Sequence, residues 1–314
     1  MKGRNNPHVA IPFESHLRWR WPHEHLMLVV CGPCRIVLRK LLPFTLAHAA
    51  AVLPFMRQPV VPMALVAGAM APDLPYFAMV PPTYGGSYAA LFNGISSHEF
   101  THILTVGMPL ALVLFGFLSF LEKPLGWALP KSWLPDISAL GVRPPTKAHV
   151  VLWTFHSLLL GLLTHLVWDS FTHSSGWVVQ QFPLLTLEPV VGIPLFRLLQ
   201  HGSSLAGLAI LALWYRGRQR TSGTFGKVAV SKERKVRTML LALVLVVPSA
   251  AAAGLGLGLG ATPIVEDAAS AELFLQGMIL RVGAALIVAL TVYGFAWHAA
   301  AMIRKVRTAA TARA

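Results

Sequence analysis

The chain has 314 residues, of which 55% are hydrophobic and only 12% are charged, and its formal net charge is +14. Soluble domains usually carry about a quarter charged residues, so this composition excludes an ordinary water-soluble globular protein. The basic residues lie in loops and tails between apolar segments and form no continuous face with aromatic side chains, which argues against nucleic-acid binding. The composition predicts an integral membrane protein whose partner is the lipid bilayer.

Residues 1–41 differ from the rest of the chain because they are rich in arginine and histidine. The apolar stretch at 26–30 is too short, and too far from the start, for a secretory signal. We interpret 1–41 as a basic N-terminal extension that is either disordered or upstream of the true start of the protein. Cys31 and Cys34 lack the strand–helix–strand surroundings of a thioredoxin-like site.

From residue 42 onward, apolar stretches recur at lengths that match the thickness of a bilayer. The first, 43–55, is short and ends near Pro54, so it predicts a partial or re-entrant helix. The second, 60–80, is long enough to cross, but it contains three prolines, which at membrane depth usually mark a break that lines a cavity or a packed interface. Further spans are predicted at 103–121, 149–169, 204–215, 240–259 and 276–303.

These segments predict an all-α, polytopic bundle of about six transmembrane spans with a broken or re-entrant first helical region. We divide it into a membrane domain with polar motifs (42–215), a basic cytoplasmic loop (216–238) and a C-terminal helix pair with a basic tail (239–314). Lysine and arginine are enriched in cytoplasmic loops. The clusters in 216–238 and 304–307 therefore predict an N-in, C-in protein of the cytoplasmic membrane.

Several ionisable side chains fall at the end of the predicted spans that this orientation assigns to the outer face. Such groups are costly in an apolar bundle and normally face a cavity, one another or a ligand. His98 and His102 are four residues apart, so a helix would place both on one face. His165, Asp169 and His173 repeat this interval and form a second stripe. We predict that these five residues bind a divalent metal, zinc first, with manganese or iron as alternatives.

Two carboxylates are candidates for acid–base chemistry. His98 to His102 spells H-E-x-x-H, the zincin spacing in which the glutamate, here Glu99, acts on the metal-bound water, although no third-ligand signature of a zincin follows. Asp73 lies between two prolines, where it either points inward as a general base or caps a half-helix. Lone histidines elsewhere are more simply explained by hydrogen bonds between helices: His48, His149 and His156.

Five short motifs occur in order: PFTLAH at 43–48, PDLPYF at 72–77, SH at 97–98, THLVWDSFTH at 164–173 and QHGSS at 200–204. Together they resemble the domain-of-unknown-function 4184 family of bacterial membrane proteins, over about residues 42–215. More distantly, the pattern is similar to membrane-bound proteins regarded as metal-dependent hydrolases. By that analogy the site candidates are His48, Asp73, His98, His165, Asp169, His173 and His201, and Gln200 stands next to the last of them.

The resulting hypothesis is a membrane-embedded, metal-dependent hydrolase whose site lies at the outer leaflet. A divalent ion would activate a water molecule for attack on a lipid or lipid-linked ester or phosphoester. The alternative is a transporter, or a proton- or cation-conducting protein, that uses the same histidines and aspartates. A third interpretation is a scaffold in which the polar cluster only fixes helix packing. The sequence identifies no protein partner.

Overall fold

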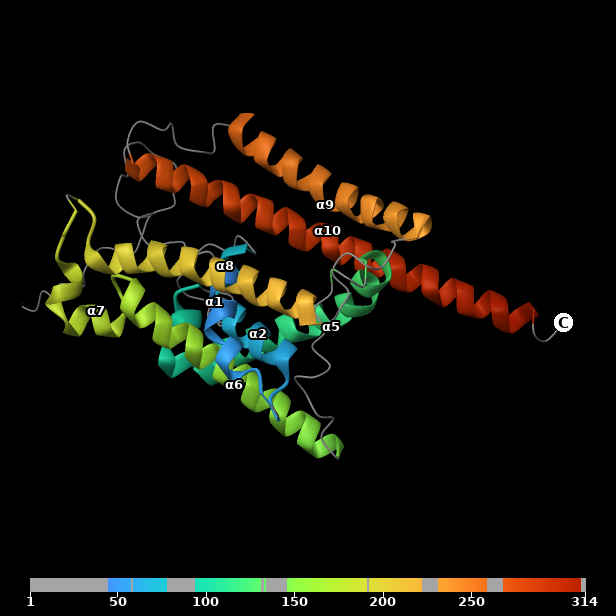
Figure 1. The fold of residues 1–314 in the computed structure, drawn as a ribbon, viewed down its shortest axis with the longest axis horizontal. Coiled ribbons are helices and arrows are strands. Elements are labelled where there is room, and N and C mark those ends of the chain that lie inside the picture. The colour runs from blue at the N-terminus through green and yellow to red at the C-terminus, as the bar shows by residue number, and fades with distance from the viewer. Residues whose placement is uncertain are drawn as a thin grey trace, which may run out of the picture. The chain divides into compact units, whose positions relative to one another are not determined.

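The computed structural model of the protein describes residues 45–57, 59–77, 94–130, 133, 146–190, 192–221, 231–258 and 268–311. The regular elements of these segments are helical, apart from one β-bridge between Val190 and Ile193 (Figure 1). The predicted N-terminal extension, with its two cysteines, lies outside the described residues.

Five helical segments of the described chain are long and apolar enough to cross a membrane. Exposed side chains such as Leu213, Val246 and Phe295 cover their outward faces, as expected where lipid rather than water surrounds a protein. The prediction of an all-α bundle with several helices that could span a membrane is confirmed, with five such helices in the described residues against the six or so expected. The main helices of these spans are α5 (Met108–Ala128), α6 (Lys147–Thr172), α8 (Leu195–Thr221), α9 (Lys232–Gly258) and α10 (Ala268–Thr311).

The first helical region is short and broken, as predicted. Helix α1 (Thr45–Ala51) ends soon after it begins, and α2 (Pro62–Met70) has nine residues, which span only about 14 Å. The chain then continues through a 3-10 turn, η2 (Ala71–Asp73), into α3 (Leu74–Phe77). The expected crossing at 60–80 is therefore not one helix, because the prolines of η2 and α3 remove backbone donors that a continuous helix needs.

Two predicted boundaries shift in the structure. The span predicted at 204–215 belongs to a longer helix, α8, and the segment predicted as a basic loop at 216–238 is helical at both of its ends. A hydropathy pattern detects only the apolar part of a helix. Arginine and lysine are good helix formers, so a helix can continue through them toward water. Residues 222–230 lie outside the described part of the chain.

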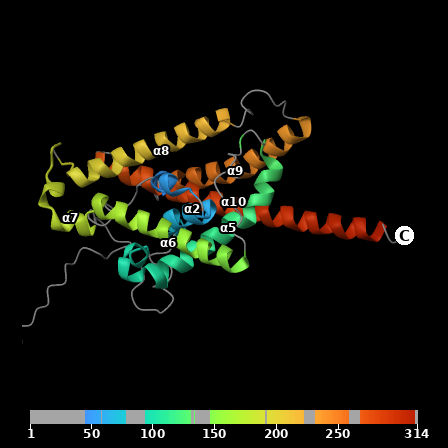
Figure 2. The ribbon, with the colours of Figure 1, turned by 60° about the horizontal axis from the view of Figure 1, so that its bottom comes forward.

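Helix α2 packs tightly against α6 (Figure 1, Figure 2). Gly68 of α2 and Gly161 of α6 face each other at the crossing, and a methyl group built on either would overlap a backbone carbonyl of the other helix. Small residues at such a contact let transmembrane helices approach through van der Waals packing. Ser157 of α6 adds a hydrogen bond, because its hydroxyl accepts the backbone N–H of Val61 at 2.9 Å. The two helices thus form the tight centre of the membrane domain.

The C-terminal helices α9 and α10 pack on each other and on α5. The Arg234 side chain donates to the carbonyl of Leu129 at 2.6 Å, and the Thr238 hydroxyl donates to that of Ala128 at 2.8 Å. These are carbonyls that the end of a helix leaves without an intrahelical partner. The first turns of α9 therefore cap the C-terminus of α5.

Gly161→Ala should lower the free energy of unfolding by about 1–3 kcal/mol, because the added methyl group forces two helix backbones apart. Thermal unfolding of the purified protein in detergent measures the effect. Gly116→Ala in α5 is the matched control, since a methyl group there meets no atom of the described segments within 4 Å. Equal melting temperatures for the two variants would contradict the tight crossing.

Candidate metal centre

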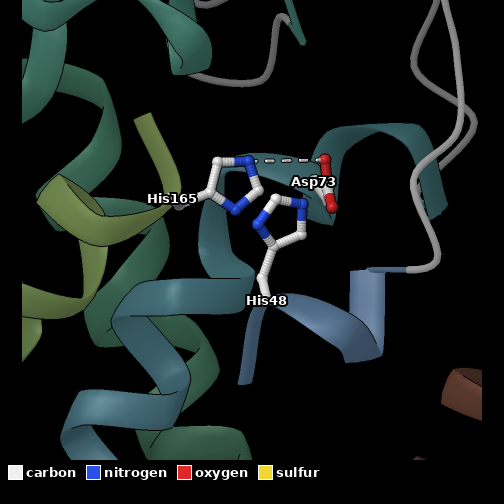
Figure 3. A group of neighbouring side chains, drawn as sticks. All are labelled: His48, Asp73 and His165. Carbon is white, nitrogen blue, oxygen red and sulfur yellow. Dashed lines mark ion pairs between the residues drawn. The ribbon is translucent and has the colours of Figure 1, made fainter. Parts of the chain in front are cut away.

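Histidines and aspartates from four separate segments meet beside α2 and α6. His48 comes from α1, Asp73 ends η2, and His98 ends the 3-10 turn η3 (Ser96–His98). His165 and Asp169 lie one turn apart on α6. Figure 3 shows the side chains of His48, Asp73 and His165 directed toward one another. We call the following six residues the histidine–aspartate cluster: His48, Asp73, His98, His165, Asp169 and His173.

The centre of the cluster is a pair of imidazole rings, those of His98 and His165, whose Nε2 atoms lie 3.2 Å apart. The Nδ1 atom of His98 is 2.8 Å from the carbonyl oxygen of Gly94, and that of His165 is 2.8 Å from the carbonyl oxygen of Ala69. A carbonyl oxygen only accepts, so both Nδ1 atoms carry a proton, and when the two rings are neutral both Nε2 atoms present a lone pair. Two facing lone pairs repel each other, and a cation between them removes that repulsion.

Both carboxylates of the cluster face this pair of nitrogens. Asp73 Oδ1 lies 3.2 Å from His98 Nε2 and 3.8 Å from His165 Nε2, the second contact being the dashed line in Figure 3. Asp169 Oδ2 lies 3.4 Å and 3.2 Å from the same two nitrogens. In the described part of the chain, Asp73 Oδ2 and both oxygens of Asp169 are buried without a hydrogen-bond partner. Buried carboxylates are costly unless a cation compensates them.

The donor set fits a divalent metal ion. In a tetrahedral site with bonds of about 2.0–2.2 Å, two ligand atoms are about 3.4 Å apart, and the contacts among these nitrogens and oxygens lie between 3.2 and 3.8 Å. Neutral imidazole and carboxylate suit zinc, manganese or iron. A carbonyl that accepts the other ring N–H is also the usual outer partner of a metal-binding histidine. The buried histidines and aspartates can therefore hold a metal ion.

The remaining two histidines of the cluster lie on the other side of Asp169. Asp169 Oδ1 is 3.6 Å from His48 Nε2 and 3.5 Å from His173 Nδ1. The His48 ring stacks on that of His165, with centroids 4.0 Å apart and planes inclined by 23°. His173 follows the last residue of α6, and its Nε2 atom lies 3.2 Å from the amide Nε2 of Gln200. Asp169 thus has imidazole nitrogens next to both of its oxygens.

The structure does not bring Glu99 and His102 into the cluster. The expectation that His98 and His102 share a helix face assumed a continuous helix, but the chain forms two 3-10 turns, η3 and η4 (Phe100–His102). Glu99 stands between them in an extended conformation, with φ −99° and ψ 132°. Glu99 is exposed and the His102 side chain is 44% exposed, and the two pair with each other, His102 Nδ1 to Glu99 Oε2, at 2.8 Å. The H-E-x-x-H spacing therefore does not form a zincin helix.

The other candidates divide between the cluster and the surface. Gln200 is buried and contacts His173, whereas His201 is exposed on α8. His149 and His156 are exposed and lie outside the cluster. Their bonds, to the Thr146 side chain and the Leu152 carbonyl, are made within α6 and its N-cap and not to a neighbouring helix, as had been expected.

His48 differs from these structural histidines. It is buried, and neither of its ring nitrogens has a hydrogen-bond partner in the segments that the structure describes. An interpretation as a lone structural histidine therefore does not fit it. The resemblance that includes PFTLAH at 43–48 was the signal that pointed to this residue.

A buried hydrogen bond that the sequence did not indicate holds the two turns of the site together. The Ser97 hydroxyl donates to the carbonyl of Pro72 at 2.7 Å, and so joins η3 to η2. The Tyr76 hydroxyl donates to the carbonyl of Gly94 at 3.1 Å, the same carbonyl that accepts from His98. These contacts keep the His98 ring next to the carboxylate of the preceding segment.

Membrane-spanning helices around a buried histidine–aspartate cluster define the class: a polytopic integral membrane protein with a candidate metal centre. The chain belongs to the family described as Domain of unknown function (DUF4184), whose model matches residues 42–295. The match includes the whole cluster and continues past the predicted limit at residue 215 into α10. No curated protein and no solved structure matches the chain, so no named relative supports the more distant resemblance to hydrolases.

Ser97→Ala should lower the free energy of unfolding by about 1–3 kcal/mol, because it leaves the buried carbonyl of Pro72 without its donor. The measurement is thermal or denaturant unfolding in detergent. Ser249→Ala is the control, because the bond that it removes lies within α9, from the hydroxyl to the carbonyl of Leu245 at 2.7 Å. Its free energy of unfolding should change by less than about 0.5 kcal/mol. A Ser97 variant as stable as this control would show that the link between η2 and η3 contributes little.

Proposed function

We propose that the protein is a metal-dependent hydrolase that acts on a lipid or lipid-linked ester or phosphoester at the outer leaflet. The observation that carries the proposal is the pair formed by His98 and His165. Their Nε2 atoms lie 3.2 Å apart while both Nδ1 atoms donate to backbone carbonyls. With two buried carboxylates beside it, this pair suits a divalent cation, and zinc is the first choice.

A divalent ion in such a site lowers the pKa of a bound water toward neutrality. In this proposal His98, His165 and Asp169 hold the ion, and Asp73 accepts the proton of the water. Asp73 suits this role because Oδ1 faces the imidazole pair while Oδ2 has no hydrogen-bond partner among the described residues. The water oxygen bonds to the acyl carbon or phosphorus, the bond to the leaving alcohol breaks, and the proton passes through Asp73 to the leaving oxygen.

The surroundings of the cluster favour a substrate with a membrane-embedded part. Access is from the side of His98 and His173, whose side chains are 19% and 17% exposed. Next to His173 the chain forms α7 (Trp177–Gln181) and the turn η8 (Pro183–Thr186). Both elements expose large apolar side chains, including Trp177 and Leu184. Aromatic and apolar groups of this kind belong at the headgroup level of a bilayer, where a lipid ester would also lie.

The length of α8 supports a position of the histidine–aspartate cluster near the outer face of the membrane. The helix begins near the cluster, with Gln200 in contact with His173, and continues to Arg216 and Arg218. Sixteen to eighteen helical residues cover about 24–27 Å, most of the thickness of a hydrocarbon core. If the arginines are cytoplasmic, as the positive-inside rule favours, the cluster faces the opposite leaflet.

The purified, zinc-supplemented protein should contain stoichiometric zinc when its metal content is measured by elemental mass spectrometry. His165→Ala and Asp169→Ala should lose the ion that His98, His165 and Asp169 hold, because each variant removes one of its ligands. His156→Ala, which lies on the same helix outside the cluster, and His102→Ala should retain the metal. Metal-free wild-type protein would overturn the proposal, and if that protein moved protons across liposomes, the transporter alternative would take its place.

Asp73→Asn should retain zinc, but its hydrolytic rate should be at least about 100-fold lower than that of the wild type, because the amide cannot accept the proton of the water. The assay uses mixed micelles that contain a fluorogenic phospholipid. Glu122→Gln, at an exposed position of α5, is the control for the loss of a carboxylate. A Glu99→Gln variant without activity, beside an active Asp73→Asn, would assign the base to Glu99 instead.

A further inference from the structure

Asp169 stands between two pairs of imidazole rings. Its Oδ2 atom faces His98 and His165 at 3.4 and 3.2 Å, and these rings hold the ion of the proposed function. Its Oδ1 atom faces His48 and His173 at 3.6 and 3.5 Å, and the proposed function leaves this second pair unused. The carboxylate therefore has two sides with the same set of ligand types.

The His48 ring is the strongest sign that the second side binds something. It is 4% exposed, and both of its nitrogens lack a hydrogen-bond partner within the described segments. Burial of an imidazole with neither nitrogen bonded costs the free energy of the hydrogen bonds that it made in water. A ligand that the ring binds through a lone pair would recover this cost.

The ion of His165 cannot be that ligand. A metal lies close to the plane of the imidazole that binds it, and the rings of His48 and His165 stack with centroids 4.0 Å apart and planes only 23° from parallel. Rings that are stacked in this way have no common in-plane position for one ion, although both lie near Asp73. His48 must therefore bind at a separate position, and Asp169 Oδ1 is the oxygen that faces it there.

His173 completes this second position through its contact with Gln200. The amide of Gln200 has a donor end and an acceptor end of the same shape, and it is buried 3.2 Å from His173 Nε2. With the acceptor oxygen turned to this nitrogen, Nε2 carries the proton and Nδ1 presents its lone pair on the side of Asp169 Oδ1. Gln200 then orients a metal-binding histidine in the way that outer partners commonly do.

We infer that the protein holds two divalent metal ions, bridged by the carboxylate of Asp169. The first ion binds His98 and His165, and the second binds His48 and His173. This inference deepens the proposed function and rests on it. Paired ions about 3.5–4 Å apart hold the attacking and the leaving oxygen of an in-line displacement at phosphorus. The second position therefore narrows the substrate class to a lipid-linked phosphoester.

The test is the zinc stoichiometry of the full-length protein, loaded with zinc chloride, freed of excess by gel filtration and analysed by elemental mass spectrometry. Wild-type protein should retain two equivalents per chain. His48→Ala and His173→Ala should each retain one, which also shows that these variants are folded. His156→Ala, which removes an exposed imidazole of α6, should retain two.

The outcomes separate the two proposals. One equivalent in wild-type protein, unchanged in His48→Ala, overturns the pair of ions and leaves the single-ion hydrolase intact, whereas no retained zinc overturns both. Protein loaded with manganese gives a second measurement that does not depend on stoichiometry. Its electron paramagnetic resonance spectrum should show two spin-coupled ions in wild-type protein and an isolated ion in His173→Ala. An isolated-ion spectrum in fully loaded wild-type protein overturns the inference.

Discussion

The backbone contact between Gly68 and Gly161 is the constraint on which the rest of the membrane domain depends. Because neither residue has a side chain, α2 and α6 approach until the backbones touch. One residue beyond Gly68, the carbonyl of Ala69 then lies within 2.8 Å of Nδ1 of His165, one turn after Gly161. This hydrogen bond fixes the tautomer and the direction of the ring, so the packing of two helices determines which nitrogen faces the cluster.

The site is built where the chain departs from regular helix. Beyond α2 the prolines of η2 and α3 replace α-helical bonding with shorter turns, and the carbonyls of Ala69 and Pro72 accept from side chains. The carbonyl of Gly94, just before η3, does the same. In a bilayer no water is available for such groups, so the protein must satisfy them internally. The side chains that do so are His165, Ser97 and His98, two of which belong to the cluster. The same breaks that shorten the first helices therefore supply the groups that orient the site.

Much of the fold could be predicted from hydropathy, because span length and apolar composition follow from the bilayer itself. The proximity of His165 and Asp169 could also be predicted, because α6 is a continuous helix and residues four apart on a helix lie on the same face. The same interval failed for His98 and His102 because one extended residue, Glu99, separates two short turns, so the two histidines do not share a continuous helix. Periodicity cannot detect such a break.

The position of His48 and the tight glycine contact could not be derived from the sequence for a related reason. Periodicity does not link His48 to the other ligands, because it lies on a separate short helix before the broken segment. Glycine and alanine are most concentrated at 251–260, whereas the closely packed pair lies in α2 and α6. Composition shows that small residues are present, but only the tertiary arrangement decides which of them face another helix.

The wide spacing of the cluster along the chain has a consequence for biosynthesis. His48 and Asp73 leave the ribosome well before α6, which carries His165 and Asp169, so the early part of the chain enters the membrane without the partners of its buried polar groups. An ionisable side chain without a partner is costly in the hydrocarbon core, and α2 alone is too short to span that core. The buried polar groups of the proline-broken segment therefore gain their partners only once α6 has been made.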